Sequence, residues 1–130
     1  MILADTSAWI EYLRDRDQTV ADALEAHLDD GALLITEPVV LEVLQGGRSE
    51  DHVRRLKGLL WRARLVAVRT EDYTEAAFLY RVCRANGETV RSSLDCLIAA
   101  VAIRTGTPVL HHDRDFDALA RHTPLDARRA

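Results

Sequence analysis

The chain opens with the stretch that decides its fold class, Ile2-Leu3-Ala4-Asp5-Thr6-Ser7-Ala8-Trp9-Ile10. The three apolar residues Ile2–Ala4 predict a short buried strand that ends at Asp5. Thr6 and Ser7 directly follow that strand, and their hydroxyl groups predict the N-cap of a helix. A strand that passes straight into a helix is typical of proteins in which strands and helices alternate.

The same alternation continues along the chain. Further apolar runs predict strands at Leu33–Ile35, at 65–68 and at Val109–His111, with an edge strand at 124–127. Helical patterns separate these runs, at 20–28, 38–44, 49–63, 70–85, 93–105 and 116–120. Strands joined by helices require crossover connections, which produce parallel pairing. We therefore expect an α/β sandwich, with a central, mostly parallel sheet of four to five strands flanked by helices, in a single domain over residues 1–130.

Two helix starts are expected from local sequence. Thr70 predicts the cap of the helix that follows the third strand. Ser92 stands three residues before Asp95, a spacing that predicts a capping box in which the carboxylate reaches back to the cap.

Composition excludes several classes of protein. The chain has 130 residues, 48% of them hydrophobic and 29% charged, with a net charge of −4, which is typical of a globular domain. No apolar run approaches the roughly 20 residues of a membrane-spanning helix. The start of the chain lacks a signal-peptide pattern, and Cys83 and Cys96 have no metal-binding or disulfide spacing. We therefore expect a cytoplasmic location and no membrane association.

Five acidic residues stand where such a fold collects its functional groups. Asp5 and Asp113 follow predicted strands, and Asp115 comes two residues later. Asp95 lies in the first turn of a helix, and Glu42 interrupts an apolar run. Ligands of open parallel sheets bind beyond the carboxyl ends of the strands, so these acids are expected to meet at one edge.

Such a cluster repels itself unless protons or a cation neutralise it. Oxygen ligands select hard cations such as Mg²⁺ or Mn²⁺. A divalent ion there indicates phosphodiester hydrolysis by activated water. The hydroxyl groups of Thr6, Ser7, Ser92 and Ser93 lie beside the acids and are candidates to orient ligands or phosphate.

Each of these residues also has a structural interpretation. Asp5 and Asp95 are in positions to cap helices, and Asp113 with Asp115 fits a solvated turn. Glu42 fits the polar face of a short helix, and helix capping also accounts for the hydroxyl groups. Nucleotide binding through a GxxxxGK[ST] or GxGxxG loop is excluded because neither motif is present. His111 and His112 do not form a metal pair, since successive strand residues point to opposite faces.

Four segments together match a known family. They are 5–10 (DTSAWI), Glu42 with the preceding Pro38, 87–100 (GETVRSSLDCLIAA) and 112–116 (HDRDF). The chain resembles the PIN-domain ribonucleases, and among them the VapC toxins of bacterial VapBC toxin–antitoxin pairs. The resemblance covers essentially the whole chain. It departs from the common pattern at His112, where a Thr or Ser often precedes the fourth acid, which leaves a substrate contact by His112 open.

This resemblance implies a Mg²⁺- or Mn²⁺-dependent endoribonuclease with Asp5, Glu42, Asp95 and Asp113 as its acids. Asp5, Asp95 and Asp113 would hold the principal ion, and Asp115 would be an additional or alternative ligand. Thr6 or Ser7 matches the hydroxyl beside the first acid of the family. A tRNA or rRNA substrate, cleavage to a 5′-phosphate and a 3′-hydroxyl, a homodimer and a larger assembly with a VapB antitoxin are implied in the same way.

Alternative functions remain at this point. A small phosphatase with Asp5 as nucleophile is one, although Ser7 stands where its second aspartate belongs. A non-catalytic PIN-type module that binds RNA or protein is another. A receiver domain is disfavoured because the sole lysine, Lys57, lies inside a predicted helix.

An inhibitory partner is also expected on physical grounds. An acidic pocket that attracts Mg²⁺ also attracts an arginine, which would displace the ion with paired hydrogen bonds. The apolar helices near Trp9, Leu13, Val53 and Leu56 are expected to form the groove for an antitoxin segment.

Overall fold

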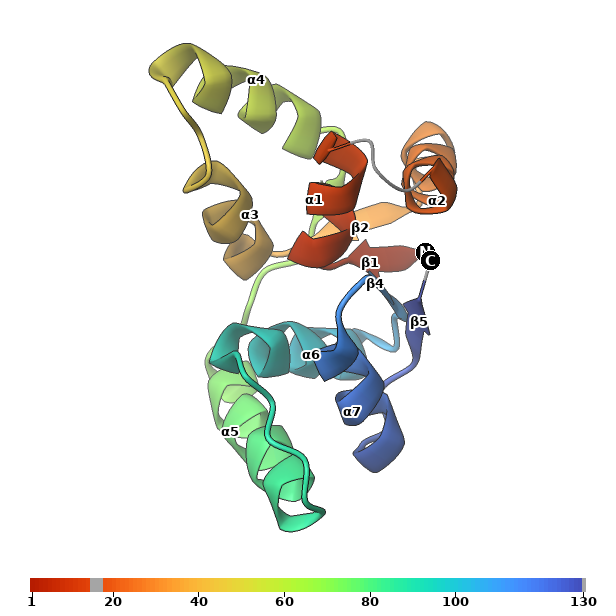
Figure 1. Cartoon of the computed structure of the whole chain (residues 1–130), viewed down its shortest axis with the longest axis vertical. Coiled ribbons are helices and arrows are strands. Elements are labelled where there is room, and N and C mark those ends of the chain that lie inside the picture. Colours follow the sequence, from red (N-terminus) through yellow and green to blue (C-terminus); the bar gives the residue numbers. More distant parts are fainter. Residues whose placement is uncertain (15–17, 130) are drawn as a thin grey trace.

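The computed structural model describes residues 1–14 and 18–129, in which five short strands form one sheet (Figure 1). The strands are β1 (Ile2–Ala4), β2 (Leu33–Ile35), β3 (Arg64–Leu65), β4 (Val109–His111) and β5 (Ala127–Arg129). The helices are α1 (Thr6–Arg14), α2 (Gln18–Asp29), α3 (Glu37–Leu44), α4 (Glu50–Leu60), α5 (Thr70–Ala85), α6 (Ser93–Thr105) and α7 (Arg114–His122).

The sheet has the order β3-β2-β1-β4-β5, and every neighbouring pair is parallel. β1 and β4 are adjacent although about a hundred residues separate them, with Leu3 opposite Val109 and Ala4 opposite Leu110. The predicted α/β sandwich around a parallel sheet is therefore confirmed, and the sheet has five strands. Buried side chains from both faces form the core, as expected for a sheet covered by helices.

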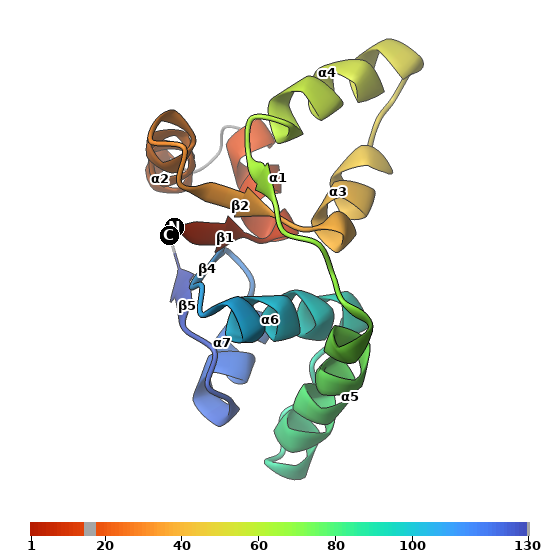
Figure 2. The ribbon, with the colours of Figure 1, turned by 180° about the vertical axis from the view of Figure 1, so that it is seen from behind.

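The helices divide into two groups on either side of β1 and β4. Helices α1 to α4 lie with β2 in one half of the molecule, and α5 to α7 lie with β5 in the other (Figure 1). Seen from behind, the segment after β3 runs from the first half to the start of α5 (Figure 2). The carboxyl ends of the central strands therefore open between two helical layers.

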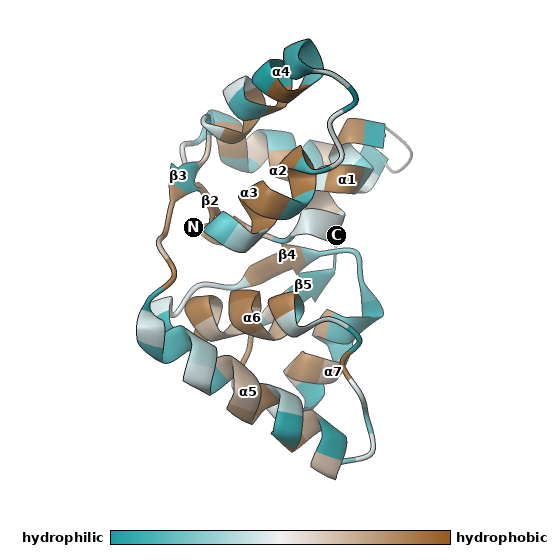
Figure 3. Ribbon diagram, turned by 90° about the vertical axis from the view of Figure 1, so that its left-hand side faces the viewer, coloured by the Kyte–Doolittle hydropathy of each residue, from teal (hydrophilic) through white to brown (hydrophobic). Residues whose placement is uncertain are grey.

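Helix α6 is the most deeply buried helix of the described structure. Its residues from Asp95 to Ala102 are all buried, and Figure 3 shows its apolar character between α5 and the sheet. Gly106 ends it with a left-handed backbone, φ 64°, which glycine adopts without strain. Because Asp95 lies in its first turn, this helix carries a carboxylate into the interior.

Two strands differ from their predicted positions. β3 was expected at 65–68 but spans Arg64–Leu65. Val66 still donates its N–H to the Ile35 carbonyl of β2, and beyond it the backbone bonds to side chains. The Ala67 carbonyl accepts from Arg104, and the Val68 N–H donates to Glu37. β5 was expected at 124–127 but spans Ala127–Arg129. Pro124 has no N–H, and the Leu125 N–H bonds to the Thr123 hydroxyl instead.

The predicted starts of α1 and α5 are wrong by one residue. Thr6 is already helical, and the Asp5 carboxylate caps α1 by accepting the Ser7 N–H. Thr70 is likewise inside α5, whose cap residue is Arg69; the carboxylate of Asp72 accepts the Arg69 N–H. In both helices an aspartate does the capping that hydroxyl groups were expected to do.

The groove expected between apolar helices is present, but of the four predicted residues Trp9 and Val53 do not line it. Trp9 is fully buried in the core. A cleft of about 330 Å³ between α1, α3 and α4 includes Leu13 and Leu56 and also Ile10 and Glu42. In the described ranges, none of the helices has both the length and the apolar character needed to cross a bilayer.

Candidate active site

Pairing of the two central strands brings two of the acids together. Asp5 follows β1 and Asp113 follows β4 after one residue. The Asp5 N–H donates to the Leu110 carbonyl at 2.9 Å, so the parallel pairing extends to Asp5 itself. Both carboxylates consequently leave the same edge of the sheet.

Each of these aspartates also caps the helix that follows it. Asp5 Oδ2 accepts from the N–H and the hydroxyl of Ser7, at 3.0 and 2.6 Å. Asp113 Oδ1 accepts the Asp115 N–H at 2.9 Å. Capping uses one oxygen of each carboxylate and leaves the other available. Asp5 Oδ1 is buried and accepts no hydrogen bond from the described residues.

Asp95 enters the same space from the first turn of α6. The predicted capping box is wrong, because Ser92 is the cap residue but the helix start carries no side-chain cap bond. The Asp95 carboxylate accepts no hydrogen bond within the described part of the chain, although it is only 7% exposed. Burial, followed by the charges of Asp5, Asp113, Asp115 and Glu42, raises the pKa of Asp95 to about 8. Such an arrangement favours a proton or a cation on this group.

Asp5 is perturbed in the same direction. Burial raises the pKa of Asp5 to about 6, although the hydrogen bonds from Ser7 and Thr6 oppose the shift. The charge of Glu42 adds to it. Two buried carboxylates that hold protons more tightly than usual are a sign of a functional site when they share one cleft.

Glu42 is oriented by a residue that sequence reasoning assigned to ligands or substrate. The Thr6 hydroxyl donates to Glu42 Oε1 at 2.8 Å, which joins α1 to α3. Glu42 therefore reaches the cleft from a helix far from β1 and β4 in sequence. Its second carboxylate oxygen takes part in no hydrogen bond among the described residues.

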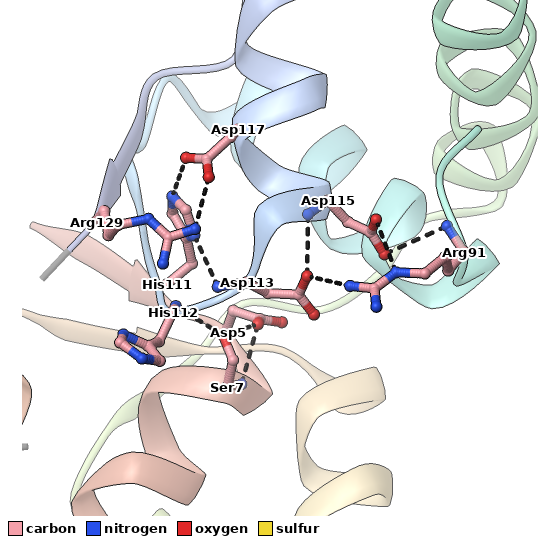
Figure 4. Close-up of polar contacts among 9 residues, drawn as sticks. All are labelled: Asp5, Ser7, Arg91, His111, His112, Asp113, Asp115, Asp117 and Arg129. Carbon is pink, nitrogen blue, oxygen red and sulfur yellow. Dashed lines mark hydrogen bonds and ion pairs between the residues drawn. The ribbon is translucent and has the colours of Figure 1, made fainter. Parts of the chain in front are cut away.

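Arg91 also contacts these acids, and sequence patterns did not single it out (Figure 4). Its Nη2 lies 2.8 Å from Asp113 Oδ1, and its Nε lies 3.2 Å from Asp115 Oδ1. The backbone N–H of Arg91 also donates to Asp115 Oδ2, at 3.2 Å. The only sequence signal was its place directly before the cap residue of α6, in the segment 87–100.

His111 supports the loop that carries Asp113. The ring is fully buried, and its Nδ1 accepts the Asp113 N–H at 3.2 Å. Its Nε2 lies 3.6 Å from Asp117, which is paired with Arg129 (Figure 4). Burial lowers the pKa of His111, so the ring is neutral near pH 7. His112 is half-buried and donates its backbone N–H to Ser7 Oγ.

All five acids line one cleft of about 330 Å³ at the carboxyl edge of the sheet. Its lining also includes Thr6, Ser7, Ile10, Arg91 and Ser92, whereas Ser93 lines a different pocket, between α5 and α6. Three carboxylates, those of Asp95, Asp113 and Asp115, offer ligand oxygens within 4.8 Å of one another. The closest group thus includes Asp115 and not Asp5.

A parallel sheet in this strand order, with carboxylates at the ends of β1 and β4 and on α3 and α6, defines a PIN domain. The profile of that family, described as PIN domain, matches residues 2–122, and the chain belongs to this family. Among curated proteins it is similar to ribonuclease VapC11 of Mycobacterium tuberculosis and to VapC ribonuclease Mb1587 of Mycobacterium bovis. Each is 42% identical over 98% of this chain and 97% of its own length.

Solved structures have the same fold. VapBC2 from Rickettsia felis, bound to a fragment of promoter DNA, contains a chain that superposes with a TM-score of 0.81 at 17% identity. The match covers 100% of this chain and 99% of that one. FitAcB from Neisseria gonorrhoeae gives 0.76 at 20% identity, over 98% and 96% of the two chains.

Proposed function

We propose that this chain is a divalent-metal-dependent endoribonuclease and the toxin of a type II VapBC toxin–antitoxin pair. The observation that carries the proposal is the meeting of five carboxylates in one cleft of a PIN domain. Relatives named VapC ribonuclease support the substrate class. We further propose that residues 1–130 act as one domain in the cytoplasm.

The residues of the cleft fit a hard divalent cation, and we propose Mg²⁺ with Mn²⁺ as a substitute. Within residues 1–14 and 18–129, no group donates a hydrogen bond to the buried Oδ1 of Asp5 or to the Asp95 carboxylate. The atoms available as metal ligands are all carboxylate oxygens, which suits Mg²⁺. Asp5, Asp95 and Asp113 would hold the ion, with Asp115 as an additional or alternative ligand. A bound divalent ion supplies a Lewis acid, which lowers the pKa of the attacking water and offsets charge at phosphorus.

The protein's own groups prepare the site for that reaction. Thr6 fixes one oxygen of Glu42, which leaves the other to orient the attacking water and accept its proton. Ser7 fixes Oδ2 of Asp5, which leaves Oδ1 as the oxygen that would bind the ion. Ser92 lines the cleft, which supports the proposal that its hydroxyl group orients phosphate. In-line attack on phosphorus would leave a 5′-phosphate and a 3′-hydroxyl.

The proposed partner is a VapB-type antitoxin, and the proposed substrate is a structured RNA such as tRNA or rRNA. The structural neighbours from Rickettsia felis and Salmonella typhimurium are VapBC complexes bound to DNA. The groove between α1, α3 and α4 shares Ile10 and Glu42 with the acidic cleft. A segment seated there would place an arginine among the carboxylates and displace the ion. We also propose a homodimer, within a larger assembly with the antitoxin.

RNA cleavage with and without metal tests the proposal. The purified chain should cleave structured RNA in Mg²⁺ or Mn²⁺ and stop when a chelator is added. Asp95→Asn should abolish cleavage, whereas Asp30→Asn, which neutralises an exposed carboxylate outside the cleft, should retain it. Hydrolysis of a phosphomonoester without RNA cleavage would support the phosphatase alternative. RNA or protein binding without cleavage would support the non-catalytic module.

The antitoxin is tested by co-expression. The chain alone should arrest growth, and the product of the neighbouring gene should restore growth, copurify and block cleavage. A harmless chain whose neighbour neither binds nor inhibits it would contradict the toxin role and leave the nuclease role standing.

A further inference from the structure

Arg91 is the one basic side chain that lines the acidic cleft within the described ranges. It comes from the segment before α6 and reaches Asp113, the cap residue of α7, and Asp115 in the first turn of that helix (Figure 4). The side chain is 53% exposed, while Asp115 beneath it is 7% exposed. The guanidinium therefore rests on a buried carboxylate and faces the open side of the cleft.

Most of the hydrogen-bonding capacity of this guanidinium is unused. A guanidinium has five N–H donors, and Arg91 uses one on Nε and one on Nη2. Three donors, both on Nη1 and the second on Nη2, have no partner within residues 1–14 and 18–129. Arginine presents such donors as a planar fork that fits two oxygens of a phosphate.

The negative charge of the cleft would repel an anionic substrate unless positive groups offset it. A phosphodiester is an anion, and five carboxylates line the space that it must enter. A divalent ion offsets only part of that charge. A fixed guanidinium at the mouth supplies a further positive charge without occupying the place of the ion, and it is oriented before the substrate arrives.

The hydrogen bonds of the carboxylates show that Arg91 and a bound cation would use different oxygens. Both oxygens of Asp115 accept hydrogen bonds from Arg91. Asp113 Oδ1 accepts hydrogen bonds from Arg91 and from the Asp115 N–H. Asp113 Oδ2 takes part in no hydrogen bond among the described residues. Asp5 Oδ1 has no hydrogen-bond partner among the described residues, and no hydrogen bond to the Asp95 carboxylate is formed there either. A cation thus has oxygens from three aspartates, while Asp115 is committed to Arg91.

From this geometry we propose that Arg91 is a catalytic residue, which binds the phosphate of the RNA beside the metal ion. Asp115 is the positioning residue that holds Arg91, and Asp113 contacts both positive groups. The inference rests on the proposed nuclease function. It adds a phosphate-binding group to the carboxylates, and it gives Asp115 a role other than that of metal ligand.

The competing interpretation is a purely structural ion pair that ties the segment before α6 to α7. The two interpretations predict different metal affinities. If Arg91 only holds Asp113 and Asp115 in place, its loss will weaken Mn²⁺ binding and cleavage in proportion. If Arg91 binds phosphate, its loss will weaken cleavage while Mn²⁺ binding stays the same or tightens, because a nearby positive charge has been removed.

The test uses Arg91→Gln and Arg91→Lys, with Arg121→Gln as the matched control. Arg121 is 55% exposed and bonds Glu88 in a similar ion pair, outside the cleft. For Arg91→Gln we expect kcat/KM on a short RNA to fall about 10- to 100-fold, the range for losing a hydrogen bond to a charged group. Mn²⁺ affinity by calorimetry should not fall. Arg91→Lys should recover part of the loss, and Arg121→Gln should match the wild type.

Two results would overturn the proposal: an unchanged kcat/KM in Arg91→Gln, or a loss of Mn²⁺ affinity that equals the loss of kcat/KM. Should Arg91→Gln fail to fold, Arg91→Lys decides by the same criteria. If the wild type cleaves no RNA, the proposed function fails on its own. Arg91 is then judged by fluorescence anisotropy of a labelled RNA in Ca²⁺, where unchanged affinity in Arg91→Gln rejects the inference.

Discussion

The Ser7 hydroxyl donates a 2.6 Å hydrogen bond to Oδ2 of Asp5, two residues earlier in the chain. The Ser7 hydroxyl oxygen in turn accepts the backbone N–H of His112 at 2.8 Å (Figure 4). One hydroxyl thus joins the residue after β1 to the residue after β4, where the two strands leave the sheet. It fixes the rotation of the Asp5 carboxylate, whose Oδ1 is left buried and open.

Ser7→Ala should lower both stability and metal affinity. The variant loses two hydrogen bonds and leaves the His112 N–H without its partner, which we expect to cost about 1–2 kcal/mol of unfolding free energy. The hydrogen bond from the Ser7 hydroxyl holds down the pKa of Asp5, so its loss raises that pKa further, although the Ser7 N–H still donates to the carboxylate. At pH 7 Mn²⁺ must then displace a proton more often, and its affinity by calorimetry should fall about threefold or more.

Ser49→Ala provides the matched control. The Ser49 hydroxyl oxygen likewise accepts a backbone N–H at a helix start, that of His52, at 3.1 Å. Loss of the Ser49 hydroxyl should lower the free energy of unfolding by a similar amount, about 1 kcal/mol. Because Ser49 caps α4 away from the acids, Mn²⁺ affinity should not change. Equal metal affinity in both variants would contradict the role assigned to Ser7.

Asp95→Asn should stabilise the metal-free protein above neutral pH. Since the pKa of Asp95 is raised to about 8 in the folded state, the folded protein binds more protons than the unfolded chain between about pH 4 and 8. The wild type therefore loses stability as pH rises through that window. An amide cannot ionise. At pH 8 the free energy of unfolding of the variant, measured by urea titration, should therefore exceed that of the wild type by about 1–3 kcal/mol, and the difference should shrink toward pH 4.

Added Mn²⁺ should reverse this order. Metal binding stabilises the wild type by mass action, whereas Asp95→Asn should show little increase in melting temperature. Asp30→Asn, at an exposed position, should behave as the wild type in both conditions. A metal-free Asp95→Asn protein that is less stable at pH 8, together with a wild type that does not respond to Mn²⁺, would indicate a purely structural carboxylate.

Sequence patterns predicted the architecture well because it depends on local signals. Each strand of three apolar residues is followed or preceded by a helical pattern, and alternation alone requires a parallel sheet. Element ends were less accurate because they depend on distant partners. The strand at 64–65 stops where Glu37 and Arg104 take over the backbone bonds, and neither contact can be read from nearby residues.

The meeting of the five acids in one cleft could be predicted from the sequence, whereas their hydrogen-bond partners could not. Acids placed after strands or in a first helical turn meet because of topology, which the order of elements determines. The hydrogen bond between Thr6 and Glu42 crosses 36 residues, and the contact of Arg91 with Asp115 crosses 24. Arg91 follows no spacing rule, so it was indistinguishable by sequence from the other arginines of the chain.

Asp115→Asn should weaken Mn²⁺ binding less than Asp113→Asn. Asp113 keeps one oxygen open to a cation, whereas both oxygens of Asp115 are bonded to Arg91. We expect Asp113→Asn to lower Mn²⁺ affinity about tenfold or more and Asp115→Asn by about threefold or less. Calorimetry on both variants checks this. Equal losses would make Asp115 a direct ligand.

Gly47→Ala should destabilise the connection between α3 and α4. A Cβ at Gly47 would lie 2.4 Å from Val53 Cγ2 and 3.1 Å from the Leu44 carbonyl oxygen. Relieving that overlap requires Val53 and α4 to shift. We expect this shift to lower the free energy of unfolding, measured by urea denaturation, by about 1–3 kcal/mol. The adjacent Gly46→Ala meets only the Val43 carbonyl oxygen, at 3.4 Å, and should change stability by about 0.5 kcal/mol or less. Equal losses of stability in the two variants would show that the protein relieves the overlap with Val53 at no measurable cost.

The pairing of Asp72 with Arg104 should make stability depend on acid pH. Asp72 is 2% exposed and accepts two 2.9 Å hydrogen bonds from Arg104. Burial alone would raise the pKa of Asp72, but the bonds from Arg104 and the Arg69 N–H outweigh it and lower the pKa below its ordinary value of 3.8. The ionised carboxylate therefore stabilises the fold above about pH 4, and this contribution is lost as pH falls through the lowered pKa.

Asp72→Asn should therefore cost about 1–3 kcal/mol of unfolding free energy at pH 7, since it leaves the partly buried Arg104 guanidinium without its counter-charge. Its deficit relative to the wild type should shrink below pH 4, where the wild type also becomes protonated. Asp126→Asn, which breaks the exposed pair with Arg128, should cost about 0.5 kcal/mol or less. Urea titrations at pH 7, 4 and 3 measure all three proteins. A deficit for Asp72→Asn that stays constant with pH would mean that packing, and not the ionised pair, is what the substitution removes.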